Sequence, residues 1–143
     1  MFKFTPKLNQ ESRNIIENRV QLKELVNCYG SPLNILFPNV MDKNISNFKE
    51  TLKKHHLSGK IYYAHKCNKS NSFLKQALQN QINVDVASLE ELKSALSNGF
   101  TGDKIEATGP KNDDFIILGI RHNIVFNVDN LEEIKKINYF KEK

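Results

Sequence analysis

Lys66 is the residue whose type and position most clearly suggest chemistry. It ends the segment Lys60–Lys66 (KIYYAHK), which has the composition of a β-strand, and strand alternation places Ala64 and Lys66 on the same face. In a barrel of parallel strands, the inward face at the carboxyl end lines the active site, and a lysine amine there can form a Schiff base with a carbonyl compound. By position alone, a solvated lysine that ends a strand is the other interpretation.

Two carboxylates follow Lys66 in the next strand and helix. Asp85 lies in the otherwise apolar segment Val84–Val86, and it needs a partner because burial of an unpaired carboxylate is costly. Lys66 on the neighbouring strand is a candidate for that partner. Glu91 follows Ser88 by three residues, which is a capping-box pattern. Capping of the helix by Glu91 and a role beside Lys66 are compatible.

The elements that position these residues form a repeat of strand and helix. Strands are predicted at residues 60–66, 83–87, 104–108 and 124–128, and helices at 40–56, 70–80, 88–98, 112–118 and 130–137. Strands that alternate with helices predict an α/β fold with right-handed crossovers and a parallel sheet in sequential strand order. Both an open doubly wound sheet and a partial (β/α)8 TIM-type barrel fit this pattern. Four such units make half of a barrel.

The N-terminal region has a different pattern. Residues 1–28 are predicted to be a helical leader, with apolar positions at helical spacing from Asn9 to Asn27. Tyr29–Pro32 is a turn signal. Leu33–Phe37 then has the composition of a short strand, which Pro38 would stop. We therefore expect two domains, a leader at 1–28 and a barrel portion at 29–143.

Composition disfavours several classes of protein. The formal net charge is +5 and the pI about 9.2, but the lysines are scattered, so we expect no nucleic-acid partner. Cys28 and Cys67 are isolated, which disfavours a metal site. The sequence contains no apolar run long enough for a membrane span and begins without a signal peptide, so we expect a cytoplasmic location and no membrane partner.

Five motifs in order resemble one enzyme family. They are Tyr29–Leu33 (YGSPL), Tyr63–Asn68 (YAHKCN), Asp85–Ser88 followed by Glu91, Gly99–Phe100 with Thr108–Lys111 (TGPK), and Val128–Glu133 (VDNLEE). Together they resemble the ornithine/diaminopimelate/arginine decarboxylases, which are alanine-racemase-like, fold-type III enzymes that use pyridoxal 5′-phosphate (PLP). The resemblance covers residues 29–137 and favours the barrel over the open sheet.

The resemblance implies roles for individual residues. Lys66 would form the internal aldimine with PLP, Ala64 would lie against the cofactor, and Asp85 and Glu91 would lie close to both. It implies decarboxylation of a basic or dibasic amino acid, a small amino-acid substrate, and a homodimer for the full-length protein. His65 departs from the family's valine and is expected to point into the packing layer.

The family's glycine-rich phosphate loop and the acidic partner of its pyridine nitrogen would lie beyond Lys143. We therefore expect residues 1–143 alone to have no appreciable decarboxylase activity. The alternative is a truncated, non-catalytic remnant that binds PLP or a partner.

Overall fold

The N-terminal part of the computed structural model consists of two helices. The structure describes residues 8–143, and its contacts divide the chain into the units Met1–Val40 and Met41–Lys143. Helices α1 (Gln10–Glu17) and α2 (Arg19–Tyr29) replace the single helix expected here. The break is at Asn18, whose ψ of 78° is not helical and whose side chain accepts a hydrogen bond from Gln21 N–H. Asn18 therefore ends one helix and caps the next.

The short strand expected at residues 33–37 is absent. This segment has no regular secondary structure, and the chain enters helix α3 (Pro38–Lys54) directly. A strand needs a neighbour that pairs with its backbone groups, and residues 33–36 make no such ladder within the described residues. Pro38 starts a helix here rather than only stopping a strand, in agreement with the preference of proline for first helical positions.

The second unit is built on a parallel sheet. Strands β1 (Tyr62–Ala64), β2 (Asn83–Val86), β3 (Ile105–Ala107) and β4 (Val125–Phe126) pair in the order β1-β2-β3-β4. All three pairings are parallel. The predicted α/β class, four-strand sheet and sequential order are therefore confirmed, although each strand is shorter than its sequence pattern suggested.

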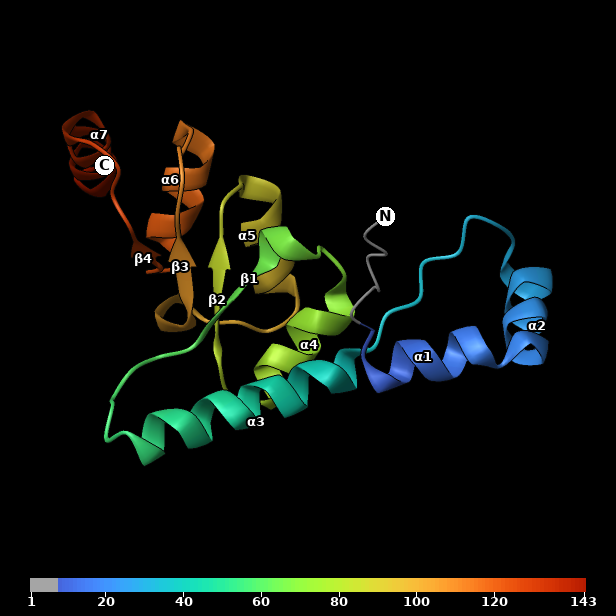
Figure 1. The fold of residues 1–143 in the computed structure, drawn as a ribbon. Coiled ribbons are helices and arrows are strands. Elements are labelled where there is room, and N and C mark those ends of the chain that lie inside the picture. The colour runs from blue at the N-terminus through green and yellow to red at the C-terminus, as the bar shows by residue number, and fades with distance from the viewer. Residues whose placement is uncertain (1–7) are drawn as a thin grey trace, which may run out of the picture. The chain divides into compact units, whose positions relative to one another are not determined.

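Helices connect the strands (Figure 1). They are α4 (Asn71–Gln79), α5 (Leu89–Ser97) and α6 (Asp113–Arg121), with short 3-10 helices η1 (His65–Cys67) and η2 (Gly102–Lys104). Helix α7 (Leu131–Lys141) follows the last strand, β4. Each of the four α-helices begins at a serine or asparagine whose side chain accepts a backbone N–H of the first turn, namely Ser70, Ser88, Asn112 and Asn130. These caps satisfy donors that a helix start leaves unpaired. No helix within residues 8–143 is both long and apolar enough to span a bilayer.

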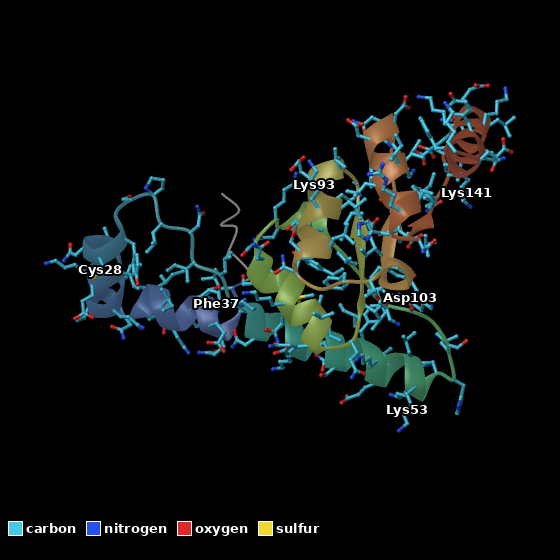
Figure 2. All side chains as sticks on the ribbon, turned by 180° about the vertical axis from the view of Figure 1, so that it is seen from behind. Cys28, Phe37, Lys53, Lys93, Asp103 and Lys141 are labelled. Carbon is cyan, nitrogen blue, oxygen red and sulfur yellow. The ribbon has the colours of Figure 1, made fainter. Side chains whose placement is uncertain are left out.

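The two faces of the sheet differ in burial. Val84, Val86, Ile105 and Ala107 are fully buried. Side chains of the helices pack in the same core cluster, among them Leu74, Ala77, Leu92, Ala95 and Phe115. Figure 2 draws the described side chains on the ribbon. The alternate positions Ala64, Asp85 and Glu106 are in register with one another and only half-buried. The sheet therefore has a helix-covered apolar face and an open face that carries polar side chains.

Candidate functional site

Lys66 lies in a tight turn rather than in a strand. Strand β1 ends at Ala64, and the chain then forms the 3-10 helix η1, which contains Lys66. The Lys66 side chain is exposed and forms no hydrogen bond or ion pair with any other described residue. Its amine is therefore accessible to a ligand at the carboxyl end of the sheet.

Hydrogen bonds fix the turn that contains Lys66. The Tyr63 hydroxyl donates to the carbonyl oxygen of Asn68 at 2.7 Å, and the Asn68 side chain accepts from Ser70 N–H at 3.0 Å. Burial, with a smaller contribution from Cys67, raises the pKa of Tyr63 to about 12. The hydroxyl is thus a permanent donor near neutral pH, and it holds the ends of the Lys66 turn together.

His65, beside Lys66, is buried as expected for the packing layer. It is 1% exposed and its ring lies 6.2 Å from that of Tyr63, measured between centroids. Its Nδ1 has no hydrogen-bond partner within the described residues. Burial lowers the pKa of His65, the charge of Glu91 raises it in part, and that of Lys69 lowers it. The net effect favours the neutral imidazole.

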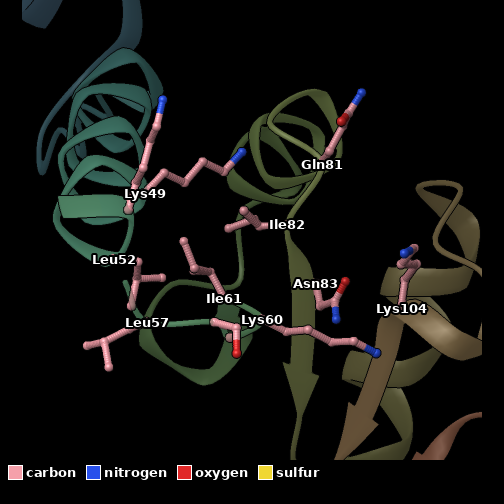
Figure 3. Close-up of a pocket in the computed structure, with 12 residues that line it drawn as sticks. Lys49, Leu52, Leu57, Lys60, Ile61, Gln81, Ile82, Asn83 and Lys104 are labelled. Carbon is pink, nitrogen blue, oxygen red and sulfur yellow. The ribbon is translucent and has the colours of Figure 1, made fainter. Parts of the chain in front are cut away.

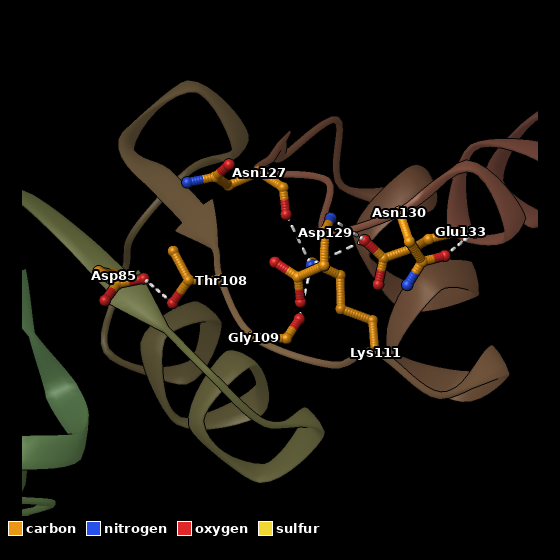
Figure 4. Close-up of polar contacts among 8 residues, drawn as sticks. All are labelled: Asp85, Thr108, Gly109, Lys111, Asn127, Asp129, Asn130 and Glu133. Carbon is orange, nitrogen blue, oxygen red and sulfur yellow. Dashed lines mark hydrogen bonds and ion pairs between the residues drawn. The ribbon is translucent and has the colours of Figure 1, made fainter.

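Asp85 faces the open side of the sheet, next to Ala64 in register. Its Oδ1 accepts a hydrogen bond from the Thr108 hydroxyl at 2.6 Å (Figure 4). Thr108, rather than the expected Lys66, is therefore the hydrogen-bond partner of Asp85 within the described residues. Glu106 is the register neighbour of Asp85 on β3, so two carboxylates lie side by side on the open face.

Glu91 combines helix capping with an ion pair. Ser88 Oγ accepts from Glu91 N–H at 3.2 Å, and Glu91 Oε2 accepts from Ala87 N–H at 2.9 Å. This is close to the capping box that the sequence pattern predicted. The difference is that Glu91 accepts from the N–H of Ala87, the residue before the cap, rather than from that of Ser88. Glu91 is 4% exposed, and its Oε1 lies 3.1 Å from Lys69 Nζ. The lysine paired with Glu91 is thus Lys69.

A second lysine–glutamate pair repeats this arrangement after β3 and β4. Lys111 Nζ donates to the carbonyl oxygens of Gly109 and Asn127, each at 2.7 Å, and to Glu133 Oε2 at 3.1 Å (Figure 4). Glu133 Oε2 also accepts from Asp129 N–H at 3.0 Å. The Lys111 side chain is fully buried, and its three ammonium protons match three acceptors.

The charge of Glu133 depends on these contacts. Burial by itself raises the pKa of Glu133, but the hydrogen bonds from Asp129 N–H and Lys111, together with the charge of Lys111, lower it below its ordinary value. The carboxylate is therefore ionised at neutral pH, and the Lys111–Glu133 pair is a buried ion pair with its polar atoms satisfied.

Sequence reasoning did not identify Lys69, Glu106, Thr108 or the Lys111–Glu133 pair as interacting groups. One signal for the second pair was present. Asn130 and Glu133 are three residues apart, as are Ser88 and Glu91, and each pair caps a helix. Each partner lysine lies 22 residues before its glutamate. It directly precedes the cap residue of the preceding helix, α4 or α6.

The chemistry available at the carboxyl end of the sheet is that of an amine beside carboxylates. An accessible primary amine can bind a carbonyl group covalently, and the half-buried Asp85 and Glu106 can bind a cationic group. Within residues 8–143, no group of three or more histidine, cysteine, aspartate or glutamate residues could hold a metal ion.

Comparison with known proteins identifies the family. Residues 40–143 match the family model described as pyridoxal-dependent decarboxylase, pyridoxal binding domain. A curated relative, the uncharacterized protein y4yA of Sinorhizobium fredii, is 36% identical over 110 residues, which cover 76% of this chain and 24% of the relative. The chain spans about a quarter to a third of the length of the curated relatives it matches.

Solved structures agree with the family model. Diaminopimelate decarboxylase from M. jannaschii in complex with L-lysine is 30% identical, with a TM-score of 0.74 over 83% of this chain and 29% of that chain. Lysine/ornithine decarboxylase from Vibrio vulnificus in complex with putrescine is 25% identical, with a TM-score of 0.69 over 95% of this chain and 35% of that chain. The parallel strands, the exposed lysine after the first of them and the match over residues 40–143 lead to one conclusion: the chain belongs to the family of pyridoxal-dependent decarboxylases, through their pyridoxal binding domain.

Proposed function

We propose that Lys66 is the residue that binds PLP covalently, and that the chain is the N-terminal portion of a decarboxylase acting on basic or dibasic amino acids. The observation that carries the proposal is the accessible amine of Lys66 directly after β1, in a domain whose family binds pyridoxal. Diaminopimelate and lysine/ornithine decarboxylases among the similar structures support the substrate class.

The side chains around Lys66 fit such a cofactor. Ala64 is small and half-buried on the open face, so its side chain would not obstruct a flat ring placed beside it. The turn that carries Lys66 is fixed by the Tyr63 and Asn68 hydrogen bonds, so the amine starts from a defined position. Bound PLP would supply an electron sink for the charge left when CO2 departs.

The carboxylates around this position would orient the reacting groups. The Thr108 hydroxyl proton is committed to Asp85 Oδ1, which leaves the Asp85 carboxylate fixed and its other oxygen free for a cationic group. We propose that Asp85 and Ala64 contact the cofactor, as sequence analysis implied. Glu91 would act at longer range, since its two oxygens already bind Ala87 N–H and Lys69.

The second candidate is the alternative that the sequence left open, a non-catalytic PLP-binding or interaction module. The accessible amine of Lys66 would serve PLP binding in that case as well. The division into a leader at 1–28 and a barrel portion at 29–143, homodimerisation of the full-length protein and a cytoplasmic location remain predictions.

Covalent trapping tests the role of Lys66. The chain is incubated with PLP, reduced with borohydride and mapped by peptide mass spectrometry. We expect label concentrated on the peptide that contains Lys66, and loss of that label in Lys66→Ala. Lys75→Ala, which removes an exposed lysine of α4, is the matched control and should leave the labelling unchanged. Label spread evenly over surface lysines, and unaltered by Lys66→Ala, would refute the assignment.

An activity assay separates the enzyme from the module. CO2 release is measured from diaminopimelate, lysine, ornithine and arginine with added PLP. For residues 1–143 alone we expect no appreciable turnover. Turnover near about 1 per second, the low end of ordinary enzymes, that disappears in Lys66→Ala would show that this segment is catalytically sufficient.

A further inference from the structure

A basic cavity lies at the end of the sheet opposite Lys66. Its volume is about 590 Å³, within the range of pockets that bind small molecules. Its lining residues precede β1, β2 and β3 or open β2, and helix α3 contributes the rest. Lys66 and Asp85, by contrast, lie at the carboxyl ends of the strands. The cavity is therefore separate from the proposed PLP site.

All of the charged side chains that line this cavity are lysines. They are Lys49, Lys53, Lys60 and Lys104, and Figure 3 labels Lys49, Lys60 and Lys104 among them. Some of this charge has a local partner. Lys49 Nζ donates to Asn80 O at 2.7 Å, at the end of α4, and Lys104 Nζ lies 3.6 Å from Asp103, an exposed pair that neutralises little. Lys53 and Lys60 have no ion pair within the described residues.

Compensation of helix ends explains only part of this cluster. Lys53 lies in the last turn of α3, where a cation favourably offsets the helix dipole, and Lys49 donates to a carbonyl oxygen at the end of α4. Lys60 lies in the loop before β1, and Lys104 ends the short helix η2. Neither residue lies at the end of an α-helix. The helix dipole therefore does not explain why both line this cavity.

Asn83 supplies the independent observation. It opens β2, lines the cavity and is 4% exposed, yet its Nδ2 has no hydrogen-bond partner among the described residues. A buried donor without an acceptor is costly. In the view of Figure 3 the Lys60 side chain runs past Asn83, and Lys104 lies on the far side of Asn83. An anion bound in the cavity would supply an acceptor for the Asn83 amide and a counter-charge for the lysines that line it.

We propose that this cavity binds a small phosphorylated molecule through Lys60, Asn83 and Lys104. A lysine ammonium group is a compact positive charge that binds phosphate oxygens. Several such cations together favour a ligand with more than one negative charge. Leu52, Leu57, Ile61 and Ile82 line the rest of the cavity. They would cover an apolar or aromatic portion, so a nucleoside diphosphate has the matching chemistry.

Calorimetric titration of the chain with ADP tests the site. We expect saturable binding that pyrophosphate displaces by competition and that adenosine does not reproduce. Lys60→Gln combined with Lys104→Gln should weaken the binding at least about tenfold, the effect of losing one charge-assisted hydrogen bond. The control is Lys75→Gln combined with Lys141→Gln, which removes the same charge from exposed positions outside the cavity and should change the affinity less than twofold.

A second variant and a local probe report on Asn83 itself. Asn83→Asp places a negative charge between the lysines and should abolish ADP binding, with retention of the far-ultraviolet circular dichroism as the folding check. In the unsubstituted chain, the Asn83 side-chain NH2 resonances should shift on titration with ADP. The proposal is overturned if no saturable binding occurs up to about 1 mM, if both lysine pairs weaken it equally, if pyrophosphate does not compete, or if adenosine binds as well as ADP.

Discussion

Two lysine–glutamate pairs in this domain share a spacing but not an environment. In the pair of Lys69 and Glu91, the lysine side chain is 67% exposed, whereas in the pair of Lys111 and Glu133 it is completely buried. Both glutamates are almost fully buried and cap a helix in the same way. The comparison shows that one local pattern yields an exposed contact or a buried one according to what surrounds the lysine.

The difference follows from the acceptors around each ammonium group. Lys111 has two backbone carbonyl oxygens in addition to its glutamate, and these compensate the loss of water on burial. Lys69 has only Glu91 as an acidic partner within the described residues, so water completes its solvation. We expect Lys111 to contribute chiefly to stability, and Lys69 to adjust the electrostatics near Lys66.

Removal of the buried cation should have the largest effect. Lys111→Met leaves Glu133 buried without its counter-ion and removes the donor from Gly109 O and Asn127 O. We expect a loss of about 3–5 kcal/mol in the free energy of unfolding, measured by urea denaturation. Lys69→Met is the matched control. A loss below about 1 kcal/mol for Lys111→Met would mean that the two environments are equivalent.

Neutralisation of the acids should have an intermediate effect that depends on pH. Glu133→Gln keeps an acceptor for Asp129 N–H but loses the charge, and we expect it to cost about 1–3 kcal/mol at pH 7. Because the pKa of Glu133 is lowered in the folded state, its contribution is present above the ordinary value of 4.5 and is lost as the pH falls through the folded pKa. Denaturation of both proteins across the acid range should therefore converge, and a constant difference would contradict this account.

His65, which is influenced by the charges of Lys69 and Glu91, should make the free energy of unfolding depend on pH. Burial lowers the pKa of His65 below its ordinary value of 6.5, so the unfolded chain binds a proton more readily than the folded one. The free energy of unfolding should be highest above pH 6.5, where His65 is neutral in both states. It should fall as the pH drops from there toward the pKa of the folded state. His65→Val should remove this decline, whereas His55→Gln, at an exposed position, should leave it. Equal pH profiles for His65→Val and the unsubstituted chain would refute it.

Loss of the exposed cation should have the smallest effect. Lys69→Met removes an ion pair in which the lysine is largely solvated, so we expect a change of about 0–1 kcal/mol in the free energy of unfolding. The change should diminish with added salt because exposed charges are screened. Denaturation at low and high ionic strength measures this. A salt-independent loss as large as that of Lys111→Met would remove the distinction between the pairs.

The sequence predicted the repeating framework better than the contacts within it. Alternating apolar segments and cap residues such as Ser88 predicted the four strands and the helices between them, because these are local patterns. The prediction of a strand at residues 33–37 was wrong because a strand needs a neighbouring strand to pair with, which composition does not reveal. The break at Asn18 was missed because apolar spacing continues across it.

The candidate site was predictable in position and less so in detail. Lys66 and Asp85 could be placed at the carboxyl end of neighbouring strands from alternation and resemblance. The bond from Thr108 to Asp85 and the burial of Lys111 depend on how the loops after β3 and β4 fold back, which is long-range information. No pattern in a single sequence specifies which of several lysine side chains becomes buried.

The placement of the two pairs has a consequence for local opening of the domain. Each pair joins the loop after one strand to the first turn of the helix after the next strand. Neighbouring strand–helix units are therefore tied together two at a time, β1 with β2 and β3 with β4. In native-state hydrogen exchange, the amide of Asp129, held by buried Glu133, should exchange more slowly than that of Ala87, whose acceptor is paired with an exposed lysine.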